Sequence, residues 1–401
     1  MFLLKINKYS LYYFLLFLLI YTSNDTLLFG TNNNKVYILI KYILLLISSL
    51  ILTIKNKKLL KKDLKILFIL TALFFINSCF SNFNFGYLYL ILILFTATTF
   101  TWNVPFDKFL IIFNKIIFIL AISSIFIYFI NLLSERFVSF FPLEYNTKHN
   151  SFYNIYLSMI FVGKEFRNFG IFREPGVFMI YLNLAYFFEL FSFEKSKKRL
   201  VSYFIAIILT LSTSGYLILF LISVFYLVKK RKVKYHLLFI VILLAISFVL
   251  FKYESIYNIL FYKIENKTGS YYARLASLTV PLEMFKNNIF GIGPEQYDKM
   301  FPQISQSLYG MRINSDISTN TYLKFLAVYG IFIFSFFIHY SIKFTTYYSR
   351  DKMLNLFLFF ILCLCLSNED CRNSFFFLLL IAYGFNRNSS NVNISYSKLN
   401  K

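Results

Sequence analysis

The sequence predicts an all-α protein, a polytopic integral membrane bundle of about twelve transmembrane helices with two large outer loops. Long apolar runs recur along almost the whole chain, and 58% of the residues are hydrophobic while 15% are charged. A soluble domain carries about 25% charged residues. The runs are continuous rather than alternating, which favours helices over a β-barrel. We therefore expect a single membrane domain over residues 1–401.

Twelve apolar stretches are candidates for membrane spans, with boundaries uncertain by several residues. They are 9–22, 36–54, 64–81, 84–101, 110–133, 174–192, 200–212, 215–228, 236–252, 320–342, 353–367 and 374–386.

The positions of lysine and arginine predict the orientation of these spans. The basic clusters "KNKKLLKKDLK" (Lys55 to Lys65), "EKSKKR" (Glu194 to Arg199) and "KKRKVK" (Lys229 to Lys234) are expected to be cytoplasmic. With both termini cytoplasmic, every strongly basic cluster falls on one side. We therefore expect the basic residues behind the net charge of +23 to set the orientation of the spans and to contact anionic membrane lipid. We reject nucleic acid as a partner.

The stretch 200–228 joins two basic clusters that should share a side, so the chain must enter the membrane and return. The turn is expected near Ser212, Thr213, Ser214 and Gly215. Each arm has about 14 residues, or about 21 Å, which is short of a hydrocarbon core of about 30 Å. Two short spans and a re-entrant hairpin both remain open.

Two long segments fall on the outer side, 134–173 and 253–319, and both carry mixed charge. A loop as long as the second is usually functional or disordered. Its segment "SYYARLASLTVPLEMFKNN" has helical periodicity interrupted by Pro281, which indicates a partly helical cap on the outer face.

The stretch "NFGIFREPGVF" places Arg167, Arg173 and Glu174 at the outer end of an apolar segment, and Pro175 suits the first turn of a helix. One interpretation is structural: Arg173 reaches the interface and Glu174 interacts with the helix dipole. The other is a basic pocket at the membrane surface. Guanidinium groups bind phosphate oxygens in pairs and keep their charge, so a lipid phosphate or diphosphate is the expected ligand.

The second outer segment offers Arg274, a Gly291-Ile-Gly293-Pro294 turn and Arg312. The turn is weak as a phosphate motif and excludes a dinucleotide fold. Asp316, Ser318, Thr319 and Asn320 cluster before the next apolar stretch, and we expect one of them to cap that helix.

Histidine and cysteine give little support for metal chemistry. His149 is the one histidine on the outer side and a candidate proton acceptor, whereas His236 and His339 fall at cytoplasmic span ends. The four cysteines show no metal spacing, and no cofactor is expected.

Four stretches then resemble, in the same order, segments of the O-antigen polymerase and ligase superfamily, in particular the Wzy-type polysaccharide polymerases. They are "RNFGIFREPGVFMIYLNLAYF", "ILTLSTSGYLILFL", "YYARLASLTVPLEMFKNNIFGIGPEQY" and "NTYLKFLAVYGIFIFSFF". The resemblance covers roughly residues 160 to 345.

The resemblance implies an enzyme of the bacterial inner membrane that polymerises undecaprenyl-diphosphate-linked oligosaccharide repeat units on its outer, periplasmic face. The product is O-antigen or capsule, and no metal is needed. A chain-length regulator and a flippase are implied partners. Arg167, Arg173 and Arg274 match the arginines that engage the diphosphate, with Arg312, Asp316, Asn320 and His149 as further substrate-binding candidates.

One departure concerns the base that activates the acceptor. Ligases of this superfamily carry a histidine in the second outer loop, but this chain has none between Arg274 and Tyr322. That absence favours a polymerase over a ligase. The general base is then Glu174, Asp316 or His149, and the choice among them is open. Glu174 has a second possible role, which is to form an ion pair with Arg173. A flippase of lipid-linked oligosaccharide is the main rival function, and a non-catalytic scaffold is the third.

Overall fold

The long apolar stretches of the sequence form helices in the computed structural model, which describes residues 8–31, 34–55, 61–81, 85–147, 150–162, 167–192, 195–230 and 269–385. The helices are α1 (Lys8–Tyr21), α2 (Leu27–Gly30), α3 (Lys35–Lys55), α4 (Lys61–Phe80), α5 (Phe85–Asn103), α6 (Phe106–Leu133), α7 (Glu135–Val138), α8 (Pro175–Leu190), α9 (Lys197–Leu209), α10 (Thr213–Lys229), α14 (Gly269–Asn287), α15 (Pro294–Tyr309), α16 (Thr321–Tyr348), α17 (Lys352–Asn368) and α18 (Phe375–Phe385), with a 3-10 turn η1 (Ser315–Ile317).

Eleven of the predicted spans coincide with α1, α3 to α6, α8 to α10 and α16 to α18, and the stretch 236–252 lies outside the described residues. By length and apolar composition α3, α6 and α16 can each cross a membrane, and several further apolar helices are shorter. The prediction of a helical membrane protein therefore holds, whereas the number of crossings remains a prediction.

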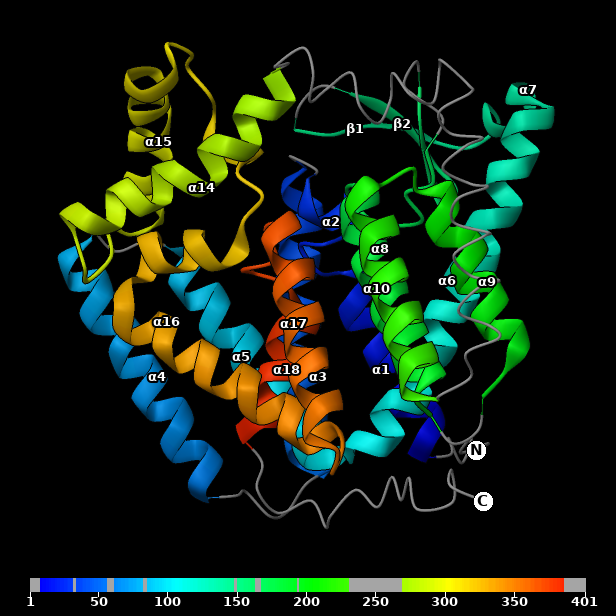
Figure 1. Cartoon of the computed structure of the whole chain (residues 1–401), viewed down its shortest axis with the longest axis horizontal. Helices are drawn as coiled ribbons and strands as arrows, with labels where there is room; N and C mark the ends of the chain where they lie inside the picture. The colour runs from blue at the N-terminus through cyan, green and yellow to red at the C-terminus, as the bar shows by residue number, and fades with distance from the viewer. Residues whose placement is uncertain are drawn as a thin grey trace.

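The two ends of the bundle differ (Figure 1). At one end of the bundle lie the last residues of α3, α10 and α16 and the first residues of α9 and α17. We call this end the basic end, because the predicted basic clusters adjoin these helix termini. At the opposite end lie α2, α7, α14, α15 and the strands, and we call it the loop end.

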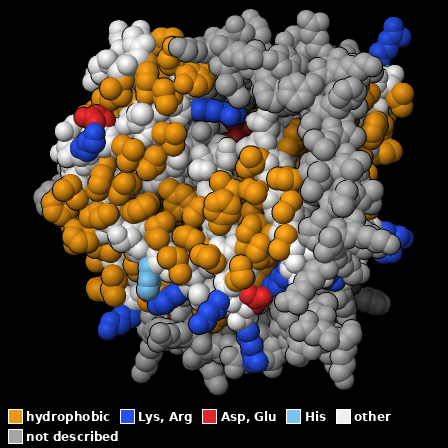
Figure 2. Space-filling model, viewed as in Figure 1, with side chains coloured by type: hydrophobic (Ala, Val, Ile, Leu, Met, Phe, Trp, Pro, Cys, Tyr) orange, Lys and Arg blue, Asp and Glu red, His pale blue; other side chains and the backbone are white. Residues whose placement is uncertain are grey.

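The side of the bundle is strongly apolar. Phe68 is 75% exposed and Phe75 is 65% exposed on α4, and large exposed apolar side chains occur on α3, α6, α16 and α17 as well. Figure 2 shows this apolar surface and, below it, a row of lysine and arginine side chains. Contiguous exposed apolar surface on this scale indicates a lipid-facing wall.

Aromatic packing places α8 and α18 at the centre of the bundle. Every residue of α18 is buried, as are nearly all those of α8. The Phe376 ring stacks on Phe113 of α6 with centroids 4.6 Å apart and lies 4.7 Å from the Tyr181 ring of α8. The loops that enter α8 and α18 therefore meet near the axis of the bundle, at its loop end.

A small antiparallel sheet departs from the all-α prediction. Strands β1 (Leu143–Tyr145), β2 (Ser151–Asn154) and β3 (Met159–Phe161) pair in the order β1-β2-β3 within the first predicted outer loop. Alternate residues of β2 are buried, and Phe152 packs against α2 and Met159 in a core separate from the bundle. Short strands of this kind are hard to recognise beside long apolar helices, because their alternation spans few residues.

The turn predicted near Ser212 is present between α9 and α10. The Ser212 hydroxyl accepts a hydrogen bond from the Gly215 amide at 3.3 Å and so caps α10, and Leu211 takes a left-handed conformation with φ of 48°. The choice between two spans and a re-entrant hairpin remains open.

The Gly-x-Gly turn has a packing role in this fold. Helix α16 is broken at Gly330, where φ is 78°, and segment 289–293 forms three backbone hydrogen bonds with segment 327–331 across the break. A Cβ on Gly291 would lie 2.5 Å from the Gly330 nitrogen, so this close approach needs glycine. Helix α14, by contrast, continues through Pro281, where an interruption was predicted.

Candidate functional site

Charged side chains from four separate segments meet at the loop end of the bundle. They come from the α1–α2 loop, the segment before α8, the first turn of α16 and the α17–α18 loop. We call them the charged cluster, and its members are Asp25, Arg173, Glu174, Lys324, Glu369, Asp370 and Arg372.

Asp370 is the hub of the charged cluster. Its carboxylate accepts two hydrogen bonds from Arg372, Nε to Oδ1 at 2.9 Å and Nη2 to Oδ2 at 3.0 Å, and Lys324 Nζ lies 2.9 Å from Oδ2. Burial opposes ionisation of Asp370, but the Arg372 guanidinium and the Lys324 ammonium outweigh it and hold the pKa of Asp370 well below its usual value. Asp370 is therefore a fixed anion.

Arg173 is positioned by its backbone and by the α17–α18 loop. Its amide donates to the Asp25 carbonyl at 2.9 Å, and Nη2 donates to the Asp370 carbonyl at 2.5 Å. Its Nε is buried and has no hydrogen-bond partner among the described residues. Burial disfavours the charge of Arg173, but Glu174 and other acids outweigh it and raise its pKa further. A buried cationic N–H without an acceptor is unusual in a folded protein.

Asp25 supports Arg173 from the α1–α2 loop. Its Oδ2 accepts hydrogen bonds from the Tyr181 hydroxyl at 2.5 Å and from the Ser374 hydroxyl. Burial raises the pKa of Asp25, and the Arg173 charge acts in the opposite direction. The Asp25 carboxyl thereby links α8 to the start of α18.

The prediction for the start of α8 is confirmed. Pro175 occupies the first turn, and Glu174 stands at the N-cap position with extended backbone. The Glu174 side chain is exposed and makes no capping hydrogen bond, so its carboxylate is available beside Arg173.

Glu369 directly follows α17 and is buried beside the first turn of α8. The residue is 8% exposed, and a Cβ on Gly176 would lie 1.7 Å from its Oε1, so the carboxyl packs directly on the first turn of α8. Burial raises the pKa of Glu369 well above its usual value, and the neighbouring Glu174 carboxylate raises it further, whereas Arg173 lowers it.

The second predicted outer loop reaches the charged cluster through Tyr297 of α15. The Lys324 ammonium lies 5.2 Å from the centroid of the Tyr297 ring, and the Arg372 guanidinium lies 6.0 Å from it. The Tyr297 hydroxyl is 3.0 Å from the Ser318 hydroxyl.

Hydrogen bonds also connect α14 to the cluster. The Ser277 hydroxyl of α14 accepts from the Thr319 amide at 3.2 Å. The Thr321 hydroxyl donates to the Glu369 carbonyl and accepts from the Cys371 amide at 2.8 Å. Thr319 and Thr321 thus link α14 to the α17–α18 loop through hydrogen bonds.

The predicted residues of the second outer loop lie at its surface, apart from one. Arg274 is exposed on α14, one helical turn from Ser277, and forms no hydrogen bond or ion pair within the described part of the chain. Arg312 and Asp316 are also exposed. Asn320 is buried and caps α16 by accepting from the Leu323 amide at 3.0 Å, as expected for one residue of its group.

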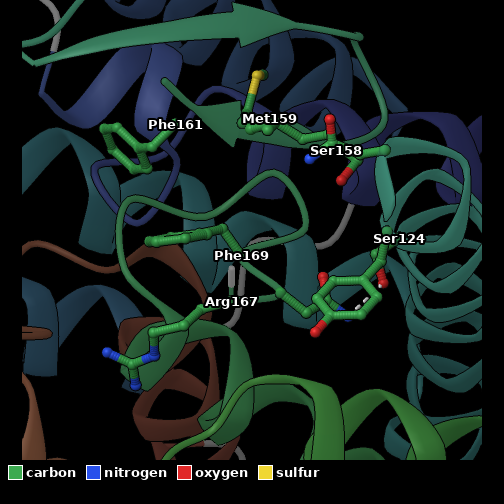
Figure 3. A pocket seen from close by; sticks show the side chains of 10 residues that line it. Ser124, Ser158, Met159, Phe161, Arg167 and Phe169 are labelled. Carbon is green, nitrogen blue, oxygen red and sulfur yellow. Dashed lines mark hydrogen bonds between the residues drawn. The ribbon is translucent and has the colours of Figure 1, made fainter. Parts of the chain in front are cut away.

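Arg167 binds a helix end. Its Nε and Nη2 donate to the carbonyls of Thr210 and Leu211 at 3.1 and 3.0 Å, where α9 finishes. Arg167 also lines a small polar pocket between α6 and β3, together with Ser124, Ser158 and other residues (Figure 3). His149 lies outside the described residues.

The family model described as O-antigen ligase matches residues 200–338. Over these residues the chain is similar to the O-antigen polymerase and ligase superfamily. No curated protein and no solved structure matches it. The superfamily implies a membrane-embedded enzyme of the glycosyl-transfer type that acts on lipid-linked oligosaccharides in polysaccharide assembly.

The superfamily match includes Arg274 and the start of α16, but not the segment with Arg173 or the α17–α18 loop. The segments outside the match supply most of the charged cluster. Within the described residues no group of three or more His, Cys, Asp or Glu side chains could hold a metal ion.

Sequence reasoning missed Asp25, Lys324, Glu369, Asp370 and Arg372. A signal was present in "SNEDCRNS" (Ser367 to Ser374), where three charged residues stand between two apolar stretches. Charge in so short a connection is expensive near a membrane and marks a functional site.

Proposed function

We propose that this protein is a member of that superfamily and polymerises undecaprenyl-diphosphate-linked oligosaccharide repeat units into O-antigen or capsule. The growing chain is transferred from its lipid diphosphate to the non-reducing end of a new lipid-linked repeat. The charged cluster at the loop end is the proposed reaction site, which faces the periplasm in the inner membrane with both termini cytoplasmic.

The proposal depends most on the hydrogen bonding of the Arg173 guanidinium. One of its N–H groups is fixed on the Asp370 carbonyl, while the buried Nε has no acceptor in the described protein. A phosphate oxygen is the acceptor best matched to a guanidinium. The diphosphate of the lipid carrier would satisfy this group.

Arg274 is the proposed second cation. It lies on α14 near Ser277, whose hydroxyl binds the segment that leads into α16 and the charged cluster. Its exposed side chain is not committed to an acceptor in the described structure. Figure 2 shows a basic side chain beside an acidic one in the upper part of this face.

The chemistry requires cations at this position. As the bond between the sugar and the diphosphate breaks, negative charge grows on the leaving phosphate oxygen. Guanidinium groups held in advance near that oxygen stabilise the transition state more than the ground state. Asp370 and Asp25 hold Arg173 in place before the substrate arrives, so little reorganisation is needed during the reaction.

The choice of polymerase over ligase depends on the residue that activates the acceptor hydroxyl. The segment between Arg274 and Tyr322 contains no histidine, whereas ligases that resemble this chain use one there. Arg312, Asp316 and Asn320 remain candidates for contact with the sugars, although Asn320 is already engaged as a helix cap.

The test is reconstitution. Purified protein in lipid vesicles is supplied with an undecaprenyl-diphosphate-linked repeat unit, with or without lipid A core as a competing acceptor. We expect a ladder of lipid-linked polymer in both reactions. Transfer to lipid A core without a ladder would make the protein a ligase, and movement of intact substrate across the vesicle without transfer would make it a flippase.

A further inference from the structure

The three buried or half-buried carboxyls of the charged cluster differ in their bonding. Asp370 is bound by Arg372 and Lys324, and Asp25 is bound by Tyr181 and Ser374. The Glu369 carboxyl, in contrast, forms no hydrogen bond or ion pair with any residue that the structure describes. It is therefore the carboxyl with free capacity to accept a proton.

The geometry holds Glu369 firmly even though its carboxyl is unbonded. Its carbonyl accepts the Thr321 hydroxyl, and its side chain rests on Gly176 in the first turn of α8. Both supports are helix termini rather than mobile loops. A reactive group on rigid elements keeps the alignment that proton transfer requires.

The surroundings make Glu369 a stronger base than an exposed glutamate. The charged groups that face its carboxyl are Glu174, Arg173, Asp370 and Arg167. Burial and the Glu174 carboxylate raise the pKa of Glu369 well above its usual value, whereas Arg173 and Arg167 act to lower it. A raised pKa makes the ionised carboxylate a stronger proton acceptor, as a general base requires.

We propose that Glu369 is the general base of the transfer reaction, which rests on the proposed glycosyl-transfer function. The acceptor hydroxyl gives its proton to the Glu369 carboxylate while its oxygen forms a bond to the anomeric carbon of the donor sugar. The bond from that carbon to the diphosphate breaks, and its electron pair leaves on the phosphate oxygen beside Arg173. Glu369 then returns its proton to water.

This assignment gives Glu174 a separate role. Glu174 is exposed at the N-cap of α8, and it acts on Glu369 and Arg173 through its charge. It is therefore a positioning residue that tunes the base. Asp316 in η1 is exposed outside the charged cluster and has no part in this step.

The experiment measures release of undecaprenyl diphosphate during sugar transfer by the full-length protein in vesicles. We expect Glu369→Gln to lower kcat by about 100-fold or more, while the affinity for a short-chain polyprenyl diphosphate stays within about threefold. Glu369→Asp should retain part of the activity. Glu174→Gln should shift the acid limb of the kcat/KM profile to lower pH, because removal of that carboxylate lowers the pKa of Glu369.

Gly176→Ala provides an independent variant, because its new Cβ must displace the Glu369 carboxyl. We expect lost kcat with diphosphate affinity retained, and Glu295→Gln on α15 should match the wild type. A Glu369→Gln enzyme with near-normal kcat and an unchanged pH profile would overturn the assignment. That result differs from failure of the proposed function, in which the wild type itself releases no diphosphate with any acceptor.

Discussion

Arg372 and Asp370 form a two-pronged ion pair, with Nε to Oδ1 at 2.9 Å and Nη2 to Oδ2 at 3.0 Å. Lys324 joins the same carboxylate from α16, so one anion connects the α17–α18 loop to the start of α16. The backbone carbonyl of Asp370 remains free for Arg173. The pair thereby sets the position of the proposed diphosphate-binding guanidinium.

Asp370→Ala should destabilise the protein strongly. The substitution leaves the buried Lys324 and the largely buried Arg372 without their anion, and breaking a buried pair in this way costs about 3 kcal/mol or more. We expect a clear fall in the midpoint of thermal unfolding in detergent. Glu295→Ala, which removes an exposed ion pair with Lys299, should change the midpoint little. Equal midpoints for both variants would contradict the role of Asp370 as hub.

The effect of pH on stability should show the ionisation of the Glu369 carboxyl. Its pKa in the folded protein is raised above the unfolded value, so its favourable contribution is complete below the unfolded value of about 4.3 and is lost as pH rises through the folded pKa. Glutamine does not titrate. As the pH rises from about 4.3 towards the folded-state pKa of Glu369, the unfolding midpoint of the wild type should therefore fall relative to that of Glu369→Gln.

The contribution of Asp370 to stability should have the opposite pH dependence, because the pKa of Asp370 is lowered in the folded protein. Its contribution is complete above the unfolded pKa of about 3.9 and is lost only in stronger acid. A parallel pH dependence for wild type and Glu369→Gln would show that Glu369 ionises as it does in the unfolded chain.

Arg173→Ala should abolish polymerisation without preventing membrane insertion. Loss of one fixed donor to developing charge typically lowers kcat by 100-fold to 1,000-fold. Arg173→Lys should also be severely impaired, because an ammonium cannot bind the Asp370 carbonyl and a phosphate with the fork geometry of arginine. Arg136→Ala, an exposed arginine on α7, is the matched control and should polymerise normally.

Arg274→Ala and Arg274→Lys should both prevent polymerisation in cells while the protein still accumulates in the membrane. The surface glycan then consists of single repeat units, which gel electrophoresis distinguishes from long chains. The lysine variant fails only if paired contact with phosphate matters. Normal chain length in the alanine variant would remove Arg274 from the site.

Arg167→Ala should loosen the α9–α10 turn. Two charge-assisted hydrogen bonds to the Thr210 and Leu211 carbonyls are lost, each worth about 1.5–3 kcal/mol in a buried setting. Because Arg167 is half-buried, we expect about 2 kcal/mol in total, seen as a lower unfolding midpoint. A stable but inactive Arg167→Ala variant would instead indicate direct contact with substrate.

Apolar periodicity predicted the helices well because burial and lipid exposure both demand long apolar runs. The same reasoning predicted Pro175 in the first turn of α8, the turn near Ser212 and a helix cap at the start of α16. It did not predict the break at Gly330, which depends on a backbone segment approaching from the second outer loop.

The charged cluster was harder to predict for a related reason. Arg173 and Glu174 were visible because they stand beside a helix start, but their partners lie about 150 or 200 residues away in sequence. Lys324 is hidden among apolar neighbours in α16, and Asp25 occupies a short polar loop that resembles an ordinary connection. The members of the charged cluster can be recognised as one group only from the structure, in which they lie together around the starts of α8 and α18.

Arg173 is proposed to bind the diphosphate of a polyprenyl-linked substrate, and equilibrium binding measures this contact. Purified wild type, Arg173→Ala and Glu295→Ala proteins are titrated with a short-chain polyprenyl diphosphate at constant salt. We expect Arg173→Ala to weaken binding by tenfold or more, while Glu295→Ala binds like the wild type. Equal affinity for the wild type and a folded Arg173→Ala protein would contradict it.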